Sequence, residues 1–330
     1  MFSALDFFAG SGLVRLGLEP EFETLWANDI CAKKKAVYAA NFPEDRFLLR
    51  SIEEVRGADL PAADLAWASF PCQDLSLAGN LTGMKGGTRS GLFWEWIRVL
   101  DEMGRCGKMP PVLVAENVVG FVVAHEGRNF RLAYQALRKR GYRAGAVVID
   151  AQMFVPQSRP RAFLVAVADS VDVEPFSQRY PCEPFHPAGV IRAANTIDDP
   201  EWIWWSLPAP TGKPPLFADL CDRDAPCDPP SKTKDLRGMM SPFNRKKLEA
   251  AIRLRHFFAG TAYRRTRPDA DGTKVQRLEI RFDGVAGCLR TPNGGSSRQT
   301  VILVDKSDVR SRLMTVRECA RLMGVPDTYR

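Results

Sequence analysis

Short apolar runs alternate with amphipathic stretches through the first half of the chain. The apolar runs predict buried strands at residues 4–8, 24–28, 65–69, 112–115, 147–150 and 163–167. Apolar residues at helical spacing predict helices at residues 31–41, 92–103 and 130–140, and Gly141 is a natural stop for the last of these. Strands that alternate with helices favour right-handed βαβ units, so we expect an α/β fold with a doubly wound, mostly parallel sheet.

The pattern changes after residue 168. Residues 169–235 are rich in proline, contain Trp202, Trp204 and Trp205, and show little periodicity, which predicts a smaller and irregular second domain. An apolar run returns at residues 301–304, and Thr315 followed by Glu318 has the pattern of a helix capping box. We therefore predict one domain from residues 1–168 plus 300–330, and a second from residues 169–299.

Composition restricts the class of protein. The chain has 330 residues, of which 45% are hydrophobic and 26% charged, and this excludes disorder as the main state. No apolar run approaches the roughly 18 residues of a membrane span. The first 18 residues are apolar but include Asp6 and Arg15 and lack a cleavage pattern, so we expect a cytoplasmic protein.

Charge is distributed unevenly. Residues 231–330 hold 22 Lys+Arg against 10 Asp+Glu, a net charge of +12, while the remaining residues have 24 against 29. Such asymmetry is typical of a polyanion-binding protein, although a solvated basic face explains charge alone equally well. The residues we single out as contacts to a polyanion are Arg245, Lys246, Lys247, Arg264, Arg265 and Arg298.

The eight cysteines are scattered and include no Cys-x2-Cys pair. Cys182 and His186 have metal-ligand spacing without a second pair, so we predict no metal site.

Two segments could bind a nucleoside ligand. A glycine turn with Gly10 and Gly12 follows the first strand directly, and Asp29 ends the second strand. A glycine turn lets a ligand approach the backbone, and an acid at that place can accept from both ribose hydroxyls. An ordinary tight turn would explain the same pattern.

Three further segments could carry chemistry. Cys72 follows Pro71 just after a strand, where a lowered pKa would make its thiol a nucleophile. Glu116 ends the strand at 112–115 and could act as a general acid, and Arg159 and Arg161 could bind an anion or orient a carboxylate. Taken singly, a structural cysteine, a capping acid and a solvated strand edge are the alternatives.

In series, these segments resemble the DNA cytosine-5 methyltransferase family. The resemblance rests on Asp-Phe-Phe-Ala-Gly-Ser-Gly (6–12), Asn-Asp (28–29), Phe-Pro-Cys-Gln-Asp-Leu-Ser (70–76), Arg-Ser-Gly-Leu-Phe (89–93), Glu-Asn-Val (116–118), Gln-Ser-Arg-Pro-Arg (157–161) and Arg-Glu-Cys-Ala-Arg-Leu-Met-Gly-Val-Pro-Asp (317–327). It implies a Rossmann-like fold of the S-adenosylmethionine-dependent methyltransferase type and a prokaryotic enzyme, of the restriction–modification or solitary type. Residues 169–280 show no match, as expected for the variable target-recognition domain of this family.

The resemblance also implies roles for single residues. Asp29 would contact the ribose of S-adenosylmethionine, and Ile30 and Ile52 its adenine. The residues implied to bind this cofactor are Phe8, Gly10, Gly12, Asp29, Ile30, Ile52, Pro71 and Leu92. Cys72 would attack C6 of the cytosine, Glu116 would protonate N3, and Arg159 and Arg161 would hold the base and the acid. The substrate would be a specific sequence in double-stranded DNA, and the target cytosine would be flipped out of the stack.

The sequence departs from the family pattern in three ways. Leu13 replaces a further glycine, and Ser51 replaces an acid that contacts the adenine, which predicts weaker cofactor binding. The sequence ends at Arg330, where the family continues into a Gly-Asn-Ser-Val-type segment and a final helix. This is expected of a fragment, of a shortened protein or of one half of a split enzyme. We expect weak cofactor binding by this chain alone, and either a second chain that supplies the segment or a monomer.

Two alternatives to a DNA methyltransferase stay open at this point. The first is a DNA-binding, catalytically weak subunit of a split methyltransferase. The second is the tRNA-methylating branch, which shares these motifs but has a smaller recognition region than the roughly 130 residues between Val167 and Val301 here.

Overall fold

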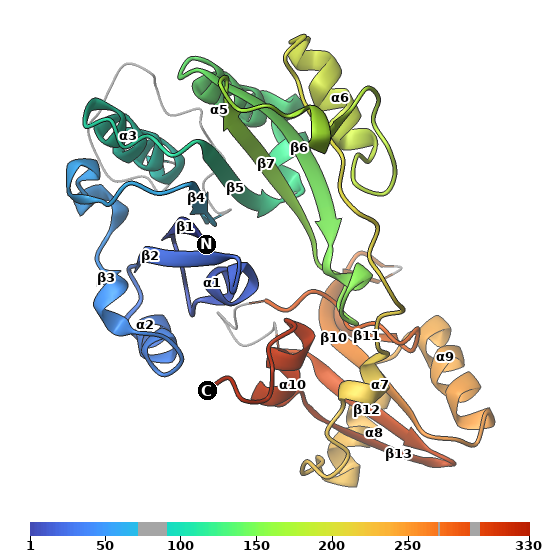
Figure 1. Ribbon diagram of the computed structural model, residues 1–330. Coiled ribbons are helices and arrows are strands. Elements are labelled where there is room, and N and C mark those ends of the chain that lie inside the picture. The colour runs from blue at the N-terminus through green and yellow to red at the C-terminus, as the bar shows by residue number, and fades with distance from the viewer. Residues whose placement is uncertain (72–90, 270, 291–297) are drawn as a thin grey trace. The chain divides into compact units, whose positions relative to one another are not determined.

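The computed structural model describes residues 1–71, 91–269, 271–290 and 298–330 (Figure 1). The chain divides into two compact units, the first with residues 1–149, 160–209 and Arg330, and the second with residues 150–159 and 210–329. These boundaries differ from the predicted ones at 168/169 and 299/300. The assignment of a catalytic and a target-recognition domain stays a prediction.

A seven-stranded sheet forms the centre of the first unit. Its strands follow the order β3-β2-β1-β4-β5-β7-β6. Their bounds are β1 (Phe2–Phe7), β2 (Phe22–Asp29), β3 (Phe47–Leu49), β4 (Leu65–Ala68), β5 (Val112–Val118), β6 (Tyr142–Asp150) and β7 (Pro160–Ala168). The pairs of β1 with β2 and β4, of β2 with β3, and of β4 with β5 are parallel, and β7 runs antiparallel to β5. The predicted doubly wound, mostly parallel sheet is confirmed.

Helices cover both faces of this sheet (Figure 1). They are α1 (Leu13–Leu18), α2 (Ala32–Ala39), α3 (Leu92–Arg105), α4 (Gly120–Val123), α5 (Arg128–Arg138) and α6 (Ala188–Ile197). The amphipathic helices α3 and α5 bury Trp96, Leu100, Phe130 and Leu137 in the main core. On the opposite side, α1 and α2 are joined by a hydrogen bond from buried Arg15 to the Tyr38 hydroxyl.

The tryptophans that marked the change of pattern belong to the first unit. Trp202 stacks on Tyr134 of α5 with ring centroids 5.4 Å apart, and both Trp202 and Trp204 pack against the main core. The two-stranded sheet of β8 (Ser177–Gln178) and β9 (Trp204–Trp205) lies in the same segment. Burial of these large aromatic surfaces keeps residues up to 209 with the parallel sheet.

The second unit has an antiparallel sheet in the order β11-β10-β12-β13. Its strands are β10 (Phe258–Pro268), β11 (Lys274–Arg281), β12 (Thr300–Asp305) and β13 (Asp308–Leu313), and its helices are α7 (Phe217–Leu220), α8 (Pro230–Gly238), α9 (Pro242–Arg253) and α10 (Val316–Leu322). We predicted that residues after 300 rejoin the first domain, but β12 pairs with β10 on one side and β13 on the other. The capping box of Thr315 and Glu318 at the start of α10 is confirmed.

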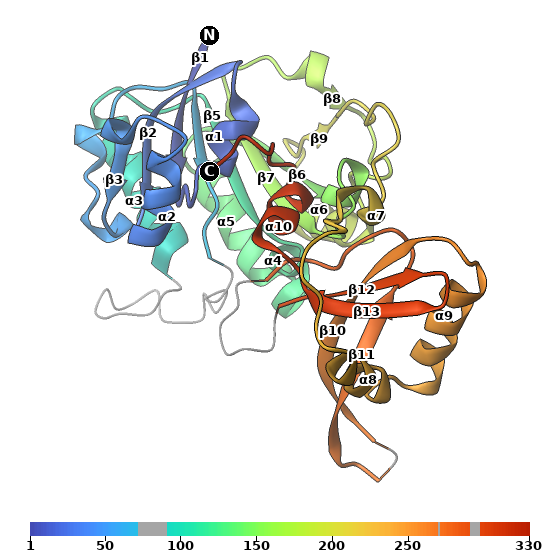
Figure 2. The same ribbon diagram turned by 90° about the horizontal axis from the view of Figure 1, so that it is seen from below.

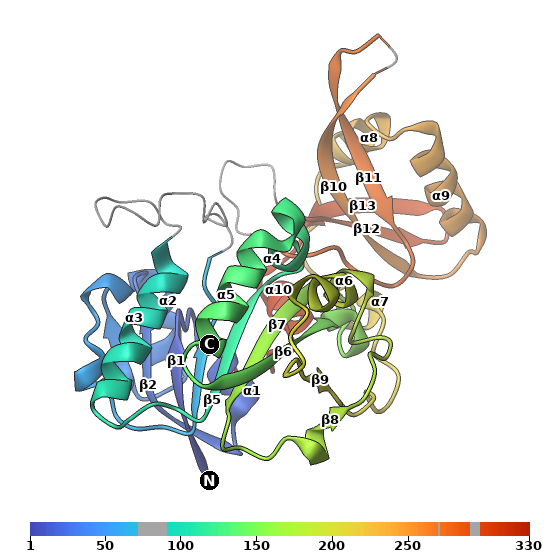
Figure 3. The same cartoon turned by 90° about the horizontal axis from the view of Figure 1, so that it is seen from above.

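Part of the second sheet extends as a two-stranded ribbon. Strand β10 pairs with β12 only through Phe258–Ala262, whereas it pairs with β11 from Thr261 to Pro268. Beyond Ala262 the two strands therefore continue alone, as Figures 2 and 3 show. None of the helices in the described parts of the chain has both the length and the apolar character needed to cross a membrane.

Candidate active site

The carboxyl ends of β1, β4 and β5 lie next to one another in the first unit. In the strand register, Asp6 is opposite Trp67, and Glu116 is opposite Phe163 of β7. Because Trp67 also pairs with Val114, two residues before Glu116, the alternation of side chains puts Asp6, Trp67 and Glu116 on one face. Polar groups from three strands thus share one face at the edge where doubly wound sheets bind ligands.

Glu116 is held by two neighbours. Its Oε2 accepts a hydrogen bond of 2.6 Å from the Ser69 hydroxyl, and its Oε1 lies 3.5 Å from Nε of Arg161. The Glu116 side chain is 21% exposed, so it remains accessible from the solvent side. This is the geometry of an oriented acid that can still reach a ligand.

The neighbouring Asn117 joins β5 to the segment that leads to Cys72. Its buried Nδ2 donates a hydrogen bond of 3.1 Å to the carbonyl oxygen of Phe70, and Pro71 follows on the surface. Cys72 itself lies outside the described residues, so its role as nucleophile stays a prediction.

Arg159 belongs to the second unit. Its backbone N–H donates to Asp150 at 2.7 Å, and its Nη1 donates to the carbonyl oxygen of Leu289 at 3.3 Å. The nearby Gln157 is fully buried and donates to the carbonyl oxygen of Leu322 in α10 at 2.7 Å. The predicted action of Arg159 on a base stays a prediction.

The glycine turn after β1 has an unusual backbone. Phe8, Gly10 and Gly12 have positive φ angles of 60°, 60° and 85°. A Cβ atom on Gly12 would lie 2.7 Å from the Phe42 ring and 2.8 Å from the Tyr38 ring. Glycine is therefore required at position 12 both for its backbone angle and for the space that the two rings fill.

Asp29 is positioned beside this turn. Its carboxylate is 4% exposed and accepts from the N–H of Gly10 at 3.1 Å, from the N–H of Cys31 at 2.8 Å and from Nζ of Lys34 at 3.1 Å. Ile30, the next residue, is 75% exposed and so offers an apolar surface next to the acid.

The remaining predicted cofactor residues differ in exposure. Ile52 is only 2% exposed and packs in the main core, and Leu92 begins α3 at the edge of the same core. Ser51 accepts a hydrogen bond of 3.4 Å from the N–H of Glu53, so an acid does lie two residues from the position where the family has one. Contacts of Ile52 and Leu92 with a cofactor stay predictions.

The sequence-based selection missed Asp6. Its side chain is completely buried, and neither carboxylate oxygen has a hydrogen-bond donor among the described residues. Burial raises its pKa well above the ordinary value, as do the charges of Glu116 and Asp29, while Arg15 opposes the shift. A charged residue inside the apolar run 4–8 was the available signal, because such a run otherwise buries apolar side chains.

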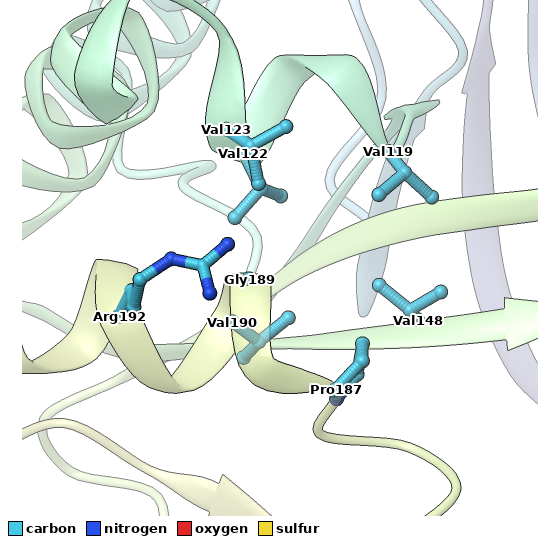
Figure 4. A pocket seen from close by; sticks show the side chains of 8 residues that line it. All are labelled: Val119, Val122, Val123, Val148, Pro187, Gly189, Val190 and Arg192. Carbon is cyan, nitrogen blue, oxygen red and sulfur yellow. The ribbon is translucent and has the colours of Figure 1, made fainter.

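An apolar pocket lies near the end of β5. It has a volume of about 230 Å³ and is lined by Val119, Val122, Val123, Val148, Pro187, Gly189, Val190 and Arg192 (Figure 4). Glu116 is not part of its lining, and Arg192 is its one ionisable residue. Within the described ranges, no group of three or more His, Cys, Asp and Glu residues is arranged to hold a metal ion.

The basic residues selected from the sequence lie on different sides of the second sheet. Arg245 and Lys246 are exposed on α9, whose buried Leu248 packs on one sheet face with Leu278. Arg264 is opposite Leu278 in the ribbon and therefore extends along that same face, whereas Arg265 points to the other face.

The other residues predicted to contact a polyanion differ in the side chains that surround them. Arg265 pairs with Glu279 at 3.1 Å, and Arg267 pairs with the same carboxylate at 2.6 Å. Lys247 lies 4.6 Å from the centre of the Phe243 ring, and Arg298 is exposed just before β12. The structure therefore brings Arg264 to the side of α9 and separates Arg265 from it.

Known proteins resemble this chain in sequence and in fold. The type II methyltransferase M.Bsp6I of Bacillus sp. (strain RFL6) is 32% identical over 169 residues, which cover 50% of this chain and 52% of that protein. The type II methyltransferase M.NgoBI of Neisseria gonorrhoeae is 31% identical over 205 residues, which cover 62% of this chain and 61% of that protein. The chain thus matches little more than half the length of these relatives.

Solved structures share the fold at low sequence identity. The S. pombe Dnmt2 methyltransferase has a TM-score of 0.59 at 14% identity, over 100% of this chain and 89% of that one. The Entamoeba histolytica methyltransferase EhMeth has a TM-score of 0.59 at 15% identity, over 100% and 88% of the two chains. The family described as C-5 cytosine-specific DNA methylase matches residues 2–330, and this chain belongs to that family.

Proposed function

We propose that the chain transfers a methyl group from S-adenosylmethionine to C5 of a cytosine in a specific sequence of double-stranded DNA. One observation supports this function most directly. The pair Glu116–Asn117 is hydrogen-bonded to the pair Ser69–Phe70, 47 residues earlier in the sequence, and Phe70 is separated from Cys72 by Pro71 alone. The acid and the segment that leads to the cysteine are thereby joined at neighbouring strand ends, which supports addition of a thiolate to a cytosine ring.

The described residues fit the cofactor. S-adenosylmethionine carries a sulfonium and an ammonium group, a ribose diol and an adenine. The buried carboxylate of Asp6 lacks a donor among the described residues, and its negative charge near this turn would favour a cationic ligand. We assign the ribose to Asp29, an apolar contact with the adenine to Ile30, and the backbone approach to Gly10 and Gly12, whose positive φ angles open the turn.

When bound, S-adenosylmethionine supplies an electrophilic methyl group. The thiolate of Cys72 adds to C6 of the cytosine while Glu116 gives its proton to N3, which makes C5 an enamine-like nucleophile. Arg161, 3.5 Å from Glu116, stabilises the carboxylate left behind. After C5 is alkylated, loss of the C5 proton to water, expulsion of the Cys72 thiolate and return of the N3 proton to Glu116 restore the aromatic ring and the starting acid.

The second unit supplies the basic surface for DNA. Arg245 and Lys246 of α9 and Arg264 of the ribbon lie along one face of its sheet. Positive charge on an exposed helix and an adjoining two-stranded ribbon suits the phosphates that flank a groove. The target base must leave the helix to meet Cys72 and Glu116, since both faces of a stacked base are covered.

Transfer of a labelled methyl group to unmethylated chromosomal DNA and, in parallel, to tRNA tests the function. We expect label in DNA alone with the wild-type chain, and none with Cys72→Ala or Glu116→Gln. Cys106→Ala and Glu21→Gln replace an exposed cysteine and an exposed acid and should retain wild-type activity. Sequencing the methylated cytosines would then give the recognition sequence.

A covalent trap tests the nucleophile separately. With 5-fluorocytosine at the target, the fluorine cannot leave as a cation, so an adduct through Cys72 should accumulate and be visible by mass spectrometry. Label in tRNA alone would reassign the substrate. DNA binding without transfer would instead indicate a subunit that needs a partner.

A further inference from the structure

Three residues in the first unit form a chain of hydrogen bonds that ends on Glu116. Trp67 is the third residue of β4, and Ser69 follows the strand directly. The indole Nε1 of Trp67 donates to Oγ of Ser69 at 2.9 Å, and that hydroxyl lies 2.6 Å from Oε2 of Glu116. The Ser69 backbone is fixed as well, because its N–H donates to the carbonyl oxygen of Phe7 at 3.3 Å.

The direction of these bonds follows from their chemistry. An indole N–H can only donate, so the Ser69 oxygen accepts from Trp67. A hydroxyl has a single hydrogen, and Glu116 Oε2 is the acceptor within reach at 2.6 Å, a length typical of a hydroxyl bonded to a carboxylate. Trp67 therefore turns the Ser69 hydrogen towards Glu116.

The two oxygens of Glu116 are consequently not equivalent. Oε2 is occupied as an acceptor, whereas Oε1 lies 3.5 Å from Nε of Arg161, longer than a usual hydrogen bond of about 2.9 Å. In a carboxylic acid the carbonyl oxygen is the better acceptor, so the bond from Ser69 to Oε2 favours the form that carries its proton on Oε1. The chain of bonds thus selects the oxygen from which a proton can be given away.

We propose that Ser69, oriented by Trp67, is a positioning residue that confines the transferable proton of Glu116 to Oε1 and stabilises the carboxylate as that proton leaves. A hydrogen bond to an ionised acceptor is roughly twice as strong as one to a neutral acceptor, so the Ser69 bond strengthens during proton transfer. An interaction that is stronger in the transition state than in the ground state raises kcat. This role depends on the proposed function, in which Glu116 protonates N3.

The test compares two variants of nearly equal shape. Ser69→Thr keeps the hydroxyl, and Ser69→Val replaces it with a methyl group. We expect Ser69→Thr to retain most of the wild-type kcat and Ser69→Val to lose about 10-fold or more, less than the loss of about 10²–10⁴-fold that removal of a general acid causes. KM for S-adenosylmethionine should stay the same in both, and Ser206→Ala, which alters an exposed serine, serves as the control.

A second measurement isolates the step at which Ser69 acts. Addition of the thiolate with protonation of N3 makes C5 exchange its hydrogen with water, and this exchange does not require a methyl donor. Unmethylated chromosomal DNA labelled with tritium at cytosine C5 should release tritium faster with the wild type and Ser69→Thr than with Ser69→Val. Thermal unfolding of each variant shows that the chain is folded.

Trp67→Phe keeps an aromatic ring against Phe163, whose centroid is 5.8 Å away, but removes the indole donor. We expect a fall in tritium release of two-fold or more, and an unchanged rate would remove Trp67 from the arrangement. Equal rates for Ser69→Thr and Ser69→Val, with Glu116→Gln inactive, would overturn the role of Ser69 and leave the proposed function intact. A wild-type chain that neither releases tritium nor transfers methyl groups would overturn both.

Discussion

The buried ion pair of Arg312 and Glu318 should control the stability of the second unit. Both side chains are 3% exposed or less, and two hydrogen bonds of 2.5 and 2.7 Å join them. Glu318 also accepts from the N–H groups of Thr315 at 2.8 Å and Asp222 at 2.9 Å. Burial alone would raise the pKa of Glu318, but the hydrogen bonds from Arg312, Thr315 and Asp222 outweigh burial and lower the pKa to about 2.

This pKa gives the size and the pH range of the effect. A fall from the ordinary value of 4.5 to about 2 corresponds to about 3 kcal/mol, at 1.36 kcal/mol per pKa unit. Because the folded value lies below the unfolded one, the stabilisation is complete above about pH 5 and is lost as the pH falls towards 2. Glu318→Gln should abolish this pH dependence. At pH 7 it should cost about 3–5 kcal/mol, since Arg312 keeps a buried charge without its partner.

The assay can separate the two units. All seven tryptophans lie between residues 26 and 205, so tryptophan fluorescence reports the first unit, and hydrogen exchange in peptides from residues 300–329 reports the second. We expect faster exchange in α10 and β13 with unchanged fluorescence. The double variant Arg312→Met/Glu318→Leu should recover most of the loss, because it removes both charges together. Exchange in Glu318→Gln equal to that of the wild type at pH 7 would refute the reasoning.

Two further predictions, each a comparison of two variants, follow from the geometry of glycines and arginines. Gly12→Ala should destabilise the first unit by about 2–4 kcal/mol, from overpacking against Phe42 and Tyr38 together with the left-handed backbone. A Cβ atom on Gly10 would lie 3.9 Å from its nearest neighbour, so Gly10→Ala should cost only the strain of the left-handed backbone, about 1–2 kcal/mol. Equal melting temperatures for the two variants would contradict this prediction. Arg264→Ala should weaken binding to all DNA duplexes alike and lower the salt slope by about 0.9 if one phosphate contact is lost. Arg265→Ala, whose charge Glu279 already compensates, should do less, and a larger effect of Arg265→Ala in salt titrations would reverse this assignment.

The sequence predicted most of the parallel sheet because its strands are buried on both sides. Continuous apolar runs give β1, β4 and β5, and the spacing of Trp96, Leu100 and Met103 gives α3. The antiparallel sheet was predicted only at residues 301–304, where four apolar residues follow one another. The ribbon of β10 and β11 was not predicted, because its exposed strands carry arginines and have no apolar pattern. The ribbon is held together by pairing between the two strands.

Within the site, motifs identified residues but not their partners. Glu116 is part of a sequence motif, whereas Ser69 and Trp67 have no unusual spacing. Their place in the site is shown only by two hydrogen bonds, from Ser69 to Glu116 across 47 residues and from Trp67 to Ser69 across 2. Arg159 and Arg161 alternate in the sequence, yet Arg161 pairs with Glu116 while Arg159 bonds to the carbonyl oxygen of Leu289 in the second unit. Contacts between distant segments depend on strand order, which local periodicity does not specify.

Asp6 connects the stability of the first unit with cofactor binding. A completely buried carboxylate without a donor among the described residues destabilises the free protein, and burial together with Glu116 and Asp29 raises its pKa against the opposing charge of Arg15. A cationic ligand favours the ionised form, so binding of S-adenosylmethionine should release a proton from Asp6 and tighten as the pH rises.

Asp6→Asn keeps the shape of the side chain and removes the charge. We expect this variant to melt at a higher temperature, since it no longer buries an ionisable carboxyl group, but to bind the cofactor about 10-fold more weakly, because the attraction between the Asp6 charge and the cationic groups of the ligand is lost. Calorimetry in buffers of different ionisation enthalpy would measure the released proton, which the variant should lack. If the variant and the wild type bind with equal affinity and release equal numbers of protons, the charge of Asp6 does not act on the cation. Its burial would then be a cost to stability that cofactor binding does not offset.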